Sequence, residues 1–471
     1  MGIGIVKTKY GDLQGVQKQN HTVFRGIPYA KAPTGNLRWK APREPDSWEG
    51  IREAKVFGNR SMQGVSEPGS FYHKEFFSDE DFMPAMSEDC LYLNIWTPAS
   101  GCDEKLPVGF WIHGGGFTGG FGTEIEFDGG AFCERNVILV TINYRLGALG
   151  FLAHEELCAE NENAVSGNYG LLDQIRALTW VFENIHSFGG DPERITIFGQ
   201  SAGCLSVQAL VSSRLTKGMI AGAILQSAGG YHTGIGRDVL LEEAKQAGRT
   251  FMEFCGKKSI TELRDLSSEE INDFSNRFLA SPLAVGPLPF SPCVDGYILE
   301  KGFDEIVDKG MHHDIPYMIG STADDLGSEQ TPPGEKSQLY KGCIDWSLKN
   351  EALGRNPSYV YYFTRAPLNS RESIHATEPS DLYGSIGLVS TIGSLSIIRD
   401  SDKSYHSAEL WYVFGTLSRS WRPKIVGDYD LSRRMTTYWC NFIRTGDPNG
   451  KFSHWKPYTV NDPFVEELCC L

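Results

Sequence analysis

The sequence predicts an α/β fold in which a mostly parallel central sheet is flanked by helices. Segments with strand character alternate with segments of helical spacing through the first half of the 471-residue chain. The strand segments are continuous apolar runs, as expected of strands that are buried on both faces. A composition of 41% hydrophobic residues with 52 glycines also permits a large core and many tight turns.

The expected elements follow one another in a regular order. Val108–Ile112 is an apolar run that leads into a glycine cluster, and Val137–Asn143 is a continuous β-branched run typical of a buried strand. Apolar residues recur at helical spacing in 171–182, and Gly189–Pro192 predicts a turn. Beyond it we expect a strand at 195–198, a helix at 202–211, and strands at 223–226, 317–319 and 359–363.

We expect a single domain spanning residues 1–471, because no internal repeat and no Pro- or Ser-rich linker divides the chain. The stretches 237–310 and 328–357 are richer in charge and helix formers, whereas 369–404 has no firm pattern and is assigned no element. We therefore predict cap insertions over the sheet around 237–310 and 328–404.

Charge and cysteine usage exclude several classes of function. A formal net charge of −15 disfavours binding to nucleic acid, whose phosphates it repels. No apolar run is long enough to span a membrane, and Met1–Lys7 does not begin a signal peptide. The eleven cysteines form no C-x-x-C pair, which predicts neither a zinc site nor a redox pair. We expect a cytoplasmic protein that needs no metal or organic cofactor.

A candidate nucleophile lies in Gly199-Gln-Ser201-Ala-Gly203, the G-x-S-x-G motif of the chain. The motif stands between the expected strand at 195–198 and the expected helix at 202–211, which is the arrangement of a nucleophile elbow. At the start of a helix, unpaired N–H groups favour negative charge next to the serine. The alternative is a glycine-rich turn whose serine only caps the helix.

A candidate oxyanion hole follows the strand at 108–112. In His113-Gly-Gly-Gly116-Phe117, glycines allow backbone N–H groups to point at a developing oxyanion without obstruction. We expect the donors to be the N–H groups of Gly115, Gly116 and Ala202. A phosphate-binding loop is the alternative, but both the G-x-G-x-x-G order and the Walker lysine are missing. We interpret His113 as an anchor for the loop rather than a catalytic base.

A serine nucleophile needs a general base, which is normally a histidine. Where the serine lies in a nucleophile elbow, the three residues follow one another in the order Ser, acid, His, so the base should come after both the serine and the acid. The histidines that remain are His375, His406 and His454. His406 stands in a loop that enters an apolar helix, as a positioned histidine requires, and we expect it to be the base. His375 lies in the segment without pattern, and His454 reads as part of a surface turn.

The acid is expected directly after the strand at 317–319, where two aspartates are adjacent. Side chains of successive residues point in different directions, so only one of Asp324 and Asp325 can face His406. We expect Asp325 to orient the imidazole and stabilise the imidazolium, with Asp324 as the alternative.

Several longer motifs also follow one another along nearly the whole chain. They are Phe24–Ala30, Leu37–Pro42, Ser87–Trp96, His113–Phe117, Asn143–Gly147, Asn168–Gln174 and Phe188–Pro192. In this order they resemble the type-B carboxylesterase/cholinesterase family of the α/β-hydrolase superfamily. The resemblance implies the α/β-hydrolase fold, a triad of Ser201, Asp325 and His406, and oxyanion donors at Gly115, Gly116 and Ala202.

The sequence also departs from the pattern of that family. The family acid is usually Glu followed by Gly, whereas here Asp325 precedes Leu326. Cholinesterases have Glu before the nucleophile, so Gln200 disfavours specialisation for choline esters. In secreted members of the family, the cysteine of Glu-Asp-Cys forms a disulfide with an upstream cysteine. Here Ser61 stands near the position of that upstream cysteine, so Cys90 lacks the partner that the resemblance implies.

The function expected from these observations is hydrolysis of carboxylic esters through an acyl-enzyme intermediate. Hydrolysis of an amide or thioester by the same triad is an alternative, as is a non-catalytic binding module of cholinesterase type. Phe117 and Phe121 near the site predict a small ester substrate with an apolar acyl or alcohol group, and Gln200 is expected in the same pocket. The sequence does not indicate the oligomeric state.

Overall fold

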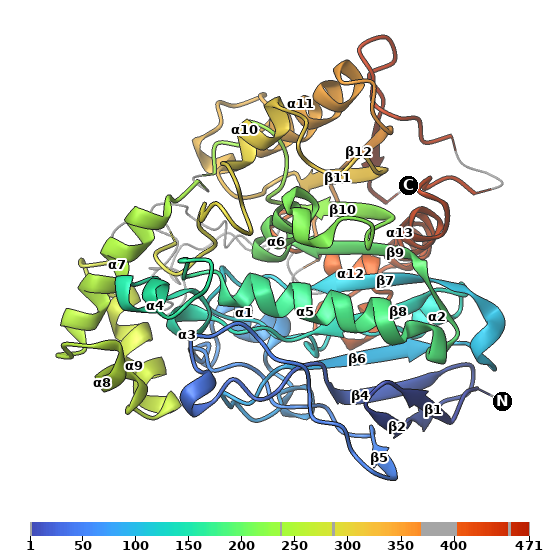
Figure 1. Cartoon of the computed structure of the whole chain (residues 1–471). Helices are drawn as coiled ribbons and strands as arrows, with labels where there is room; N and C mark the ends of the chain where they lie inside the picture. Colours follow the sequence, from blue (N-terminus) through green and yellow to red (C-terminus); the bar gives the residue numbers. More distant parts are fainter. Residues whose placement is uncertain (1, 236–237, 285–287, 369–402, 451–453, 471) are drawn as a thin grey trace.

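The computed structural model describes residues 2–235, 238–284, 288–368, 403–450 and 454–470. Its centre is a ten-stranded sheet in the order β13-β12-β11-β10-β9-β7-β8-β6-β4-β3 (Figure 1). These strands are β3 (Val16–Gln17), β4 (Thr22–Pro28), β6 (Tyr92–Thr97), β7 (Leu106–Ile112), β8 (Ile138–Ile142), β9 (Gly190–Gln200), β10 (Gly222–Gln226), β11 (Tyr317–Thr322), β12 (Ser358–Phe363) and β13 (Val465–Leu468). A separate sheet near the N-terminus contains β1 (Ile5–Thr8), β2 (Gly11–Gln14) and β5 (Ile51–Glu53).

The sheet is mostly parallel, as the sequence predicts. All pairs from β8 through β13 are parallel, and only the pairs among β8, β6, β4 and β3 are antiparallel. The predicted strands and both predicted helices are present within a few residues of the expected bounds. One prediction is wrong in detail. Gly189 has a left-handed φ of 80°, as a turn requires, but strand β9 already begins at Gly190 and includes the residues expected to complete that turn.

Helices bury both faces of the sheet, which explains why the strands are apolar without alternation. In β8, Ile138 and Val140 belong to a core on one face, and Leu139 belongs to a second core on the other. Residues of α5 and α6 fill the first core, and residues of α13 fill the second. The bounds of these helices are Tyr169–Asn184 for α5, Ala202–Ser212 for α6 and Val426–Thr445 for α13.

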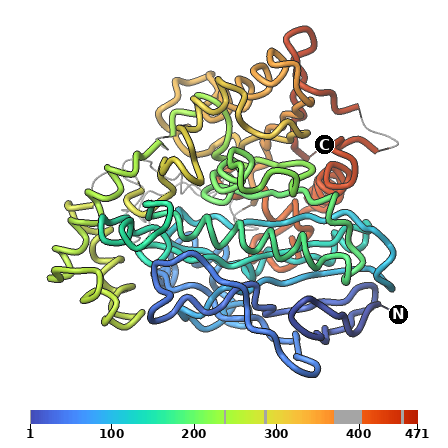
Figure 2. The backbone as a smooth tube through the Cα atoms, in the orientation of Figure 1, coloured from blue at the N-terminus to red at the C-terminus, as the bar shows by residue number. Residues whose placement is uncertain are grey.

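The remaining helices surround this core. Figure 1 shows α7, α8 and α9 grouped beyond one end of the sheet, and α10 and α11 near β11 and β12. Their bounds and those of the shorter helices are α1 (Phe71–Phe76), α2 (Gly130–Cys133), α3 (Gly147–Phe151), α4 (Glu155–Ala159), α7 (Leu241–Phe254), α8 (Ile260–Arg264), α9 (Ser268–Leu279), α10 (Phe303–Asp308), α11 (Gln338–Ala352) and α12 (Leu410–Val413). The tube in Figure 2 shows the N-terminal strands along one border of the molecule. The segment 369–402, within a predicted cap insertion, lies outside the described residues.

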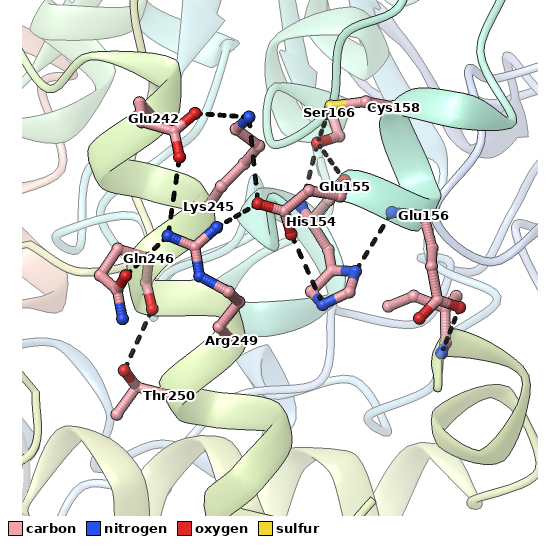
Figure 3. Close-up of polar contacts among 11 residues, drawn as sticks. His154, Glu155, Glu156, Cys158, Ser166, Glu242, Lys245, Gln246, Arg249 and Thr250 are labelled. Carbon is pink, nitrogen blue, oxygen red and sulfur yellow. Dashed lines mark hydrogen bonds and ion pairs between the residues drawn. The ribbon is translucent and has the colours of Figure 1, made fainter. Parts of the chain in front are cut away.

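Ion pairs connect α7 to α4 (Figure 3). Arg249 and Lys245 of α7 both form ion pairs with Glu155 of α4, and both also pair with Glu242 in the first turn of α7. These side chains are partly exposed, so each pair contributes little free energy alone. Together they link α7 to α4 at the surface. In the described part of the chain no helix has the length and apolar character of a membrane span.

Candidate active site

A cavity of about 490 Å³ opens over the carboxyl ends of strands β7 and β9. It brings together Ser201, His406 and Gln200 with the three glycines 114–116. Its further lining comes mainly from α1 and the loops beside it, and much of it is apolar. These lining residues include Arg60, Val65, Tyr72, His73, Phe76, Phe77, Met83, Glu124, Glu126, Phe127 and Leu410.

Ser201 occupies a sharp turn between a strand and a helix. Strand β9 ends at Gln200 and helix α6 begins at Ala202, while Ser201 has φ 59° and ψ −127°. A non-glycine residue adopts such a conformation only where its surroundings enforce it. A Cβ atom at Gly203 would overlap the carbonyl oxygens of Ile112 and His113, and one at Gly199 would overlap Gly203. The two glycines of the motif are therefore required by close packing.

The backbone around Ser201 favours negative charge. The N–H of Ser201 donates to the carbonyl of Gln226 at 2.9 Å, which fixes the turn to β10. The Ser201 side chain does not cap helix α6, so the capping alternative is wrong, and it lines the cavity instead. Ala202 is the first residue of the helix, where N–H groups have no intrahelical partner. Gly115 and Gly116 line the same cavity with left-handed φ values of 101° and 62°.

His113 anchors the glycine loop through contacts of its ring and its carbonyl. Its Nδ1 donates to the carbonyl of Gly114 at 2.9 Å, and its ring stacks on Tyr144 with centroids 4.4 Å apart. The Tyr144 hydroxyl in turn donates to the carbonyl of His113 at 3.0 Å. Complete burial lowers the pKa of His113 to about 4, which keeps the ring neutral. These contacts support the interpretation of His113 as an anchor.

His406 and Asp325 are in direct contact. Nδ1 of His406 lies 2.6 Å from Oδ1 of Asp325, and both side chains are buried. Asp325 also accepts hydrogen bonds from the N–H groups of Thr322 at 2.9 Å and Leu326 at 2.8 Å. These three contacts fix the orientation of the carboxylate. Because a carboxylate oxygen can only accept, Nδ1 of His406 is the donor in their contact, and Nε2 is the ring nitrogen that remains for proton transfer.

Asp324 has a different task. Its carboxylate accepts a hydrogen bond from the N–H of Ser404 at 2.9 Å, and its own N–H donates to the carbonyl of Ser404 at 3.0 Å. Asp324 and Tyr405 form an isolated parallel bridge. Asp324 thus ties the loop that contains His406 to the end of β11 but does not contact the imidazole.

Gln200 faces the imidazole from the elbow. Its Nε2 lies 3.2 Å from Nε2 of His406 and 3.5 Å from Nδ1. Because the two distances are similar, the amide nitrogen lies against the imidazole ring and is not in line with the lone pair of either ring nitrogen. Gln200 therefore packs on His406 and contributes to the position of its ring.

The other predicted residues lie elsewhere. Phe117 was expected in the substrate pocket, but it packs on Phe151 with ring centroids 5.2 Å apart and is not among the lining residues. Phe121 is buried behind the wall against Phe77, which does line the cavity. His454 is exposed at the surface, and His375 lies outside the described residues.

Two acidic features of the site were missed in the sequence. Glu409 is fully buried, and its Oε1 accepts a hydrogen bond from Nε2 of Gln226 at 3.4 Å. Burial and the charge of Asp325 raise the pKa of Glu409 to about 7. Glu124 and Glu126 in the cavity wall were also missed. Glutamates beside an apolar helix or in a loop are usually exposed to solvent, so nothing in a single sequence indicates that these three are buried at the site.

Comparisons with known proteins match a family and a fold over nearly the whole chain. A profile described as "Carboxylesterase family" matches residues 3–331 and 336–468. Fumonisin B1 esterase of Sphingopyxis macrogoltabida is 39% identical, covering 95% of this chain and 83% of the relative. Para-nitrobenzyl esterase of Bacillus subtilis is 32% identical over 96% of this chain and 92% of the relative. A solved PNB esterase superposes with a TM-score of 0.79 at 27% identity, covering 98% of this chain and 95% of that one. A carboxylesterase structure from Geobacillus stearothermophilus gives a TM-score of 0.76 at 30% identity, covering 99% and 96%.

Proposed function

Since the chain belongs to the carboxylesterase family and is a carboxylesterase with the α/β-hydrolase fold, we propose that Ser201, His406 and Asp325 are its catalytic triad. The observation that carries this assignment is the buried contact of 2.6 Å between Asp325 and His406, which lines the same cavity as Ser201. The position of Ser201 at the strained turn before α6 supports its role as nucleophile.

The proposed reaction proceeds in two steps. Oγ of Ser201 attacks the ester carbonyl carbon while Nε2 of His406 takes the hydroxyl proton, and Asp325 stabilises the resulting imidazolium. The oxyanion of the tetrahedral intermediate accepts hydrogen bonds from the N–H groups of Gly115, Gly116 and Ala202. The bond to the alcohol oxygen then breaks and His406 returns the proton to that oxygen. Water repeats the sequence on the acyl-enzyme and releases the acid.

The proposed substrate is a small ester with an apolar acyl or alcohol group. The support lies in the side chains of Phe76, Phe77 and Leu410, which line the cavity beside the reacting groups. Burying one methylene group in such a site contributes about 0.8 kcal/mol. We therefore expect kcat/KM to rise with chain length until the cavity is filled.

Replacing the proposed nucleophile tests this assignment. Ser201→Ala removes the attacking oxygen, so kcat for an aryl ester should fall by about 10⁴–10⁶. A fluorophosphonate probe should label the wild-type protein at Ser201 and leave the variant unlabelled. Ser212→Ala, at the far end of the same helix, is the matched control and should retain both properties. Activity within tenfold of wild type in a folded Ser201→Ala protein would exclude Ser201 as the nucleophile.

A further inference from the structure

Two glutamates in the wall of the catalytic cavity have no role in the proposed mechanism. Glu124 and Glu126 follow the glycine loop, and both line the cavity that contains Ser201 and His406. Glu124 is 7% exposed and Glu126 is fully buried. Buried glutamates are rare unless a partner compensates for the loss of hydration.

The two carboxyls lack such partners. Oε1 of Glu124 accepts one hydrogen bond, from the N–H of Phe121 at 2.9 Å. Within the described part of the chain, no residue other than Glu124 and Glu126 itself offers a hydrogen-bond partner to either carboxyl oxygen of Glu126. The carboxyls of Glu124 and Glu126 lie close enough for each to affect the pKa of the other.

The charges that face this pair do not balance. Arg60 is the cation acting on Glu124, and its guanidinium lies over the ring of Phe121 at 5.2 Å. Glu75 faces Glu126 as a further anion, but Arg422 already neutralises it in an ion pair of 2.6 Å. Two carboxyls therefore share one cation. Burial raises the pKa of Glu124 to about 7, and burial together with Glu124 raises the pKa of Glu126 well above its ordinary value.

We propose that Glu124 and Glu126 form a subsite for an ammonium group carried by the ester substrate. This inference deepens the proposed function and rests on it. One ammonium group supplies three N–H donors, which the oxygens of Glu126 lack, and adds a second cationic charge beside that of Arg60. A hydroxyl group supplies a single donor and no charge, and a carboxylate would be repelled. The aromatic rings of Phe76 and Phe127 in the same cavity also favour a cation.

Matched substrates test the subsite. In the alcohol series, the butanoate esters of 6-aminohexan-1-ol, hexane-1,6-diol and heptan-1-ol differ only in an ammonium, hydroxyl or methyl terminus. In the acyl series, aryl esters of 7-aminoheptanoate and octanoate make the same comparison. An apolar cavity alone favours the methyl terminus. With the subsite, kcat/KM for the ammonium ester should exceed that of its methyl counterpart by about tenfold or more in at least one series.

Glu126→Gln and Glu124→Gln keep the shape of each side chain and remove its charge. Each should reduce the ratio of ammonium to methyl kcat/KM to below about threefold, because a charged partner is replaced by a neutral one. Glu134→Gln, which removes an exposed carboxylate near α2, is the matched control and should leave the ratio unchanged. The ratio compares two substrates on one protein, so it is independent of the folded fraction.

Three results would overturn the inference. Equal or preferred hydrolysis of the methyl esters by the wild-type enzyme in both series would refute the subsite and leave the triad intact. An undiminished ratio in both glutamine variants would place the cation elsewhere. Failure to hydrolyse any ester, including the simple aryl ester, would reject the proposed function itself. Hexylammonium should also protect Ser201 from the fluorophosphonate probe better than hexan-1-ol does, and equal protection would likewise count against the subsite.

Discussion

Replacing Asp325 by Asn separates the proposed acid from its neighbour. The carboxylate of Asp325 lies 2.6 Å from Nδ1 of His406 and accepts two backbone N–H groups as well. The amide that Asp325→Asn introduces places either an NH₂ donor or a neutral oxygen opposite Nδ1. With the donor there, Nδ1 must accept, so the proton moves to Nε2 and that atom can no longer take the proton of Ser201.

The magnitude follows from this change of tautomer. A triad that retains its geometry but has the wrong tautomer loses about 10⁴ in kcat, which corresponds to about 5.5 kcal/mol of transition-state stabilisation. The matched variant is Asp324→Asn. Its remaining oxygen can still accept from the N–H of Ser404, so kcat should fall by less than about tenfold.

The assay is steady-state hydrolysis of an aryl butanoate, with thermal melts to confirm folding. Both variants should melt within a few degrees of the wild type, while only Asp325→Asn loses most of its kcat at unchanged KM. Equal effects of the two substitutions, or a larger effect at Asp324, would refute the assignment of the acid.

Two further predictions concern the elbow and the buried acid behind it. Gly203→Ala should lower both Tm and kcat, because the new Cβ would overlap the carbonyl oxygens of Ile112 and His113. Gly101→Ala is the control and should be tolerated, because nothing lies within 4 Å of its Cβ position. Equal melting temperatures of the two variants would contradict this prediction. Burial raises the pKa of Glu409 from 4.5 to about 7. The folded state therefore loses no stability to this group below pH 4.5, and the loss in free energy of unfolding grows to about 3 kcal/mol as the pH rises through 7. Glu409→Gln should therefore gain Tm relative to the wild type as the pH is raised from 4.5 to 8, and parallel melting curves across this range would show that Glu409 is not buried as a neutral acid.

The central elements could be predicted because strands buried on both faces leave a strong signal. The runs at 108–112 and 137–143 contain no polar alternation, and the structure places helices over both faces of these strands. The antiparallel strands β3, β4 and β6 were not predicted as strands. Strands β4 and β6 overlap the motifs Phe24–Ala30 and Ser87–Trp96, which indicate the family rather than a strand, and β3 has only two residues.

Several of these motifs prove to be scaffold. Arg38 of one motif and Glu88 of another form a buried bidentate ion pair at 2.6 and 2.7 Å. Arg145 and Asp173, from two further motifs, form a second at 2.8 and 2.7 Å. Breaking either pair would leave an uncompensated buried charge, at a cost of about 3–5 kcal/mol. Spacing along the chain does not reveal which charged residues meet in this way, so the partners could not be named from the sequence.

The proposed triad acid shows what sequence reasoning can and cannot predict. The expected strand at 317–319 placed the acid at 324–325, but the sequence alone could not show how Asp325 comes within reach of the imidazole. The structure supplies the reason through the neighbouring residue. Asp324 makes two hydrogen bonds with Ser404 and pairs with Tyr405, so the loop that contains His406 is attached directly to the end of β11. With the loop attached there, the carboxylate of Asp325 lies 2.6 Å from Nδ1 of His406. It follows that Asp325→Glu should not restore the usual geometry, since the longer side chain would have to displace a loop that Asp324 fixes in place.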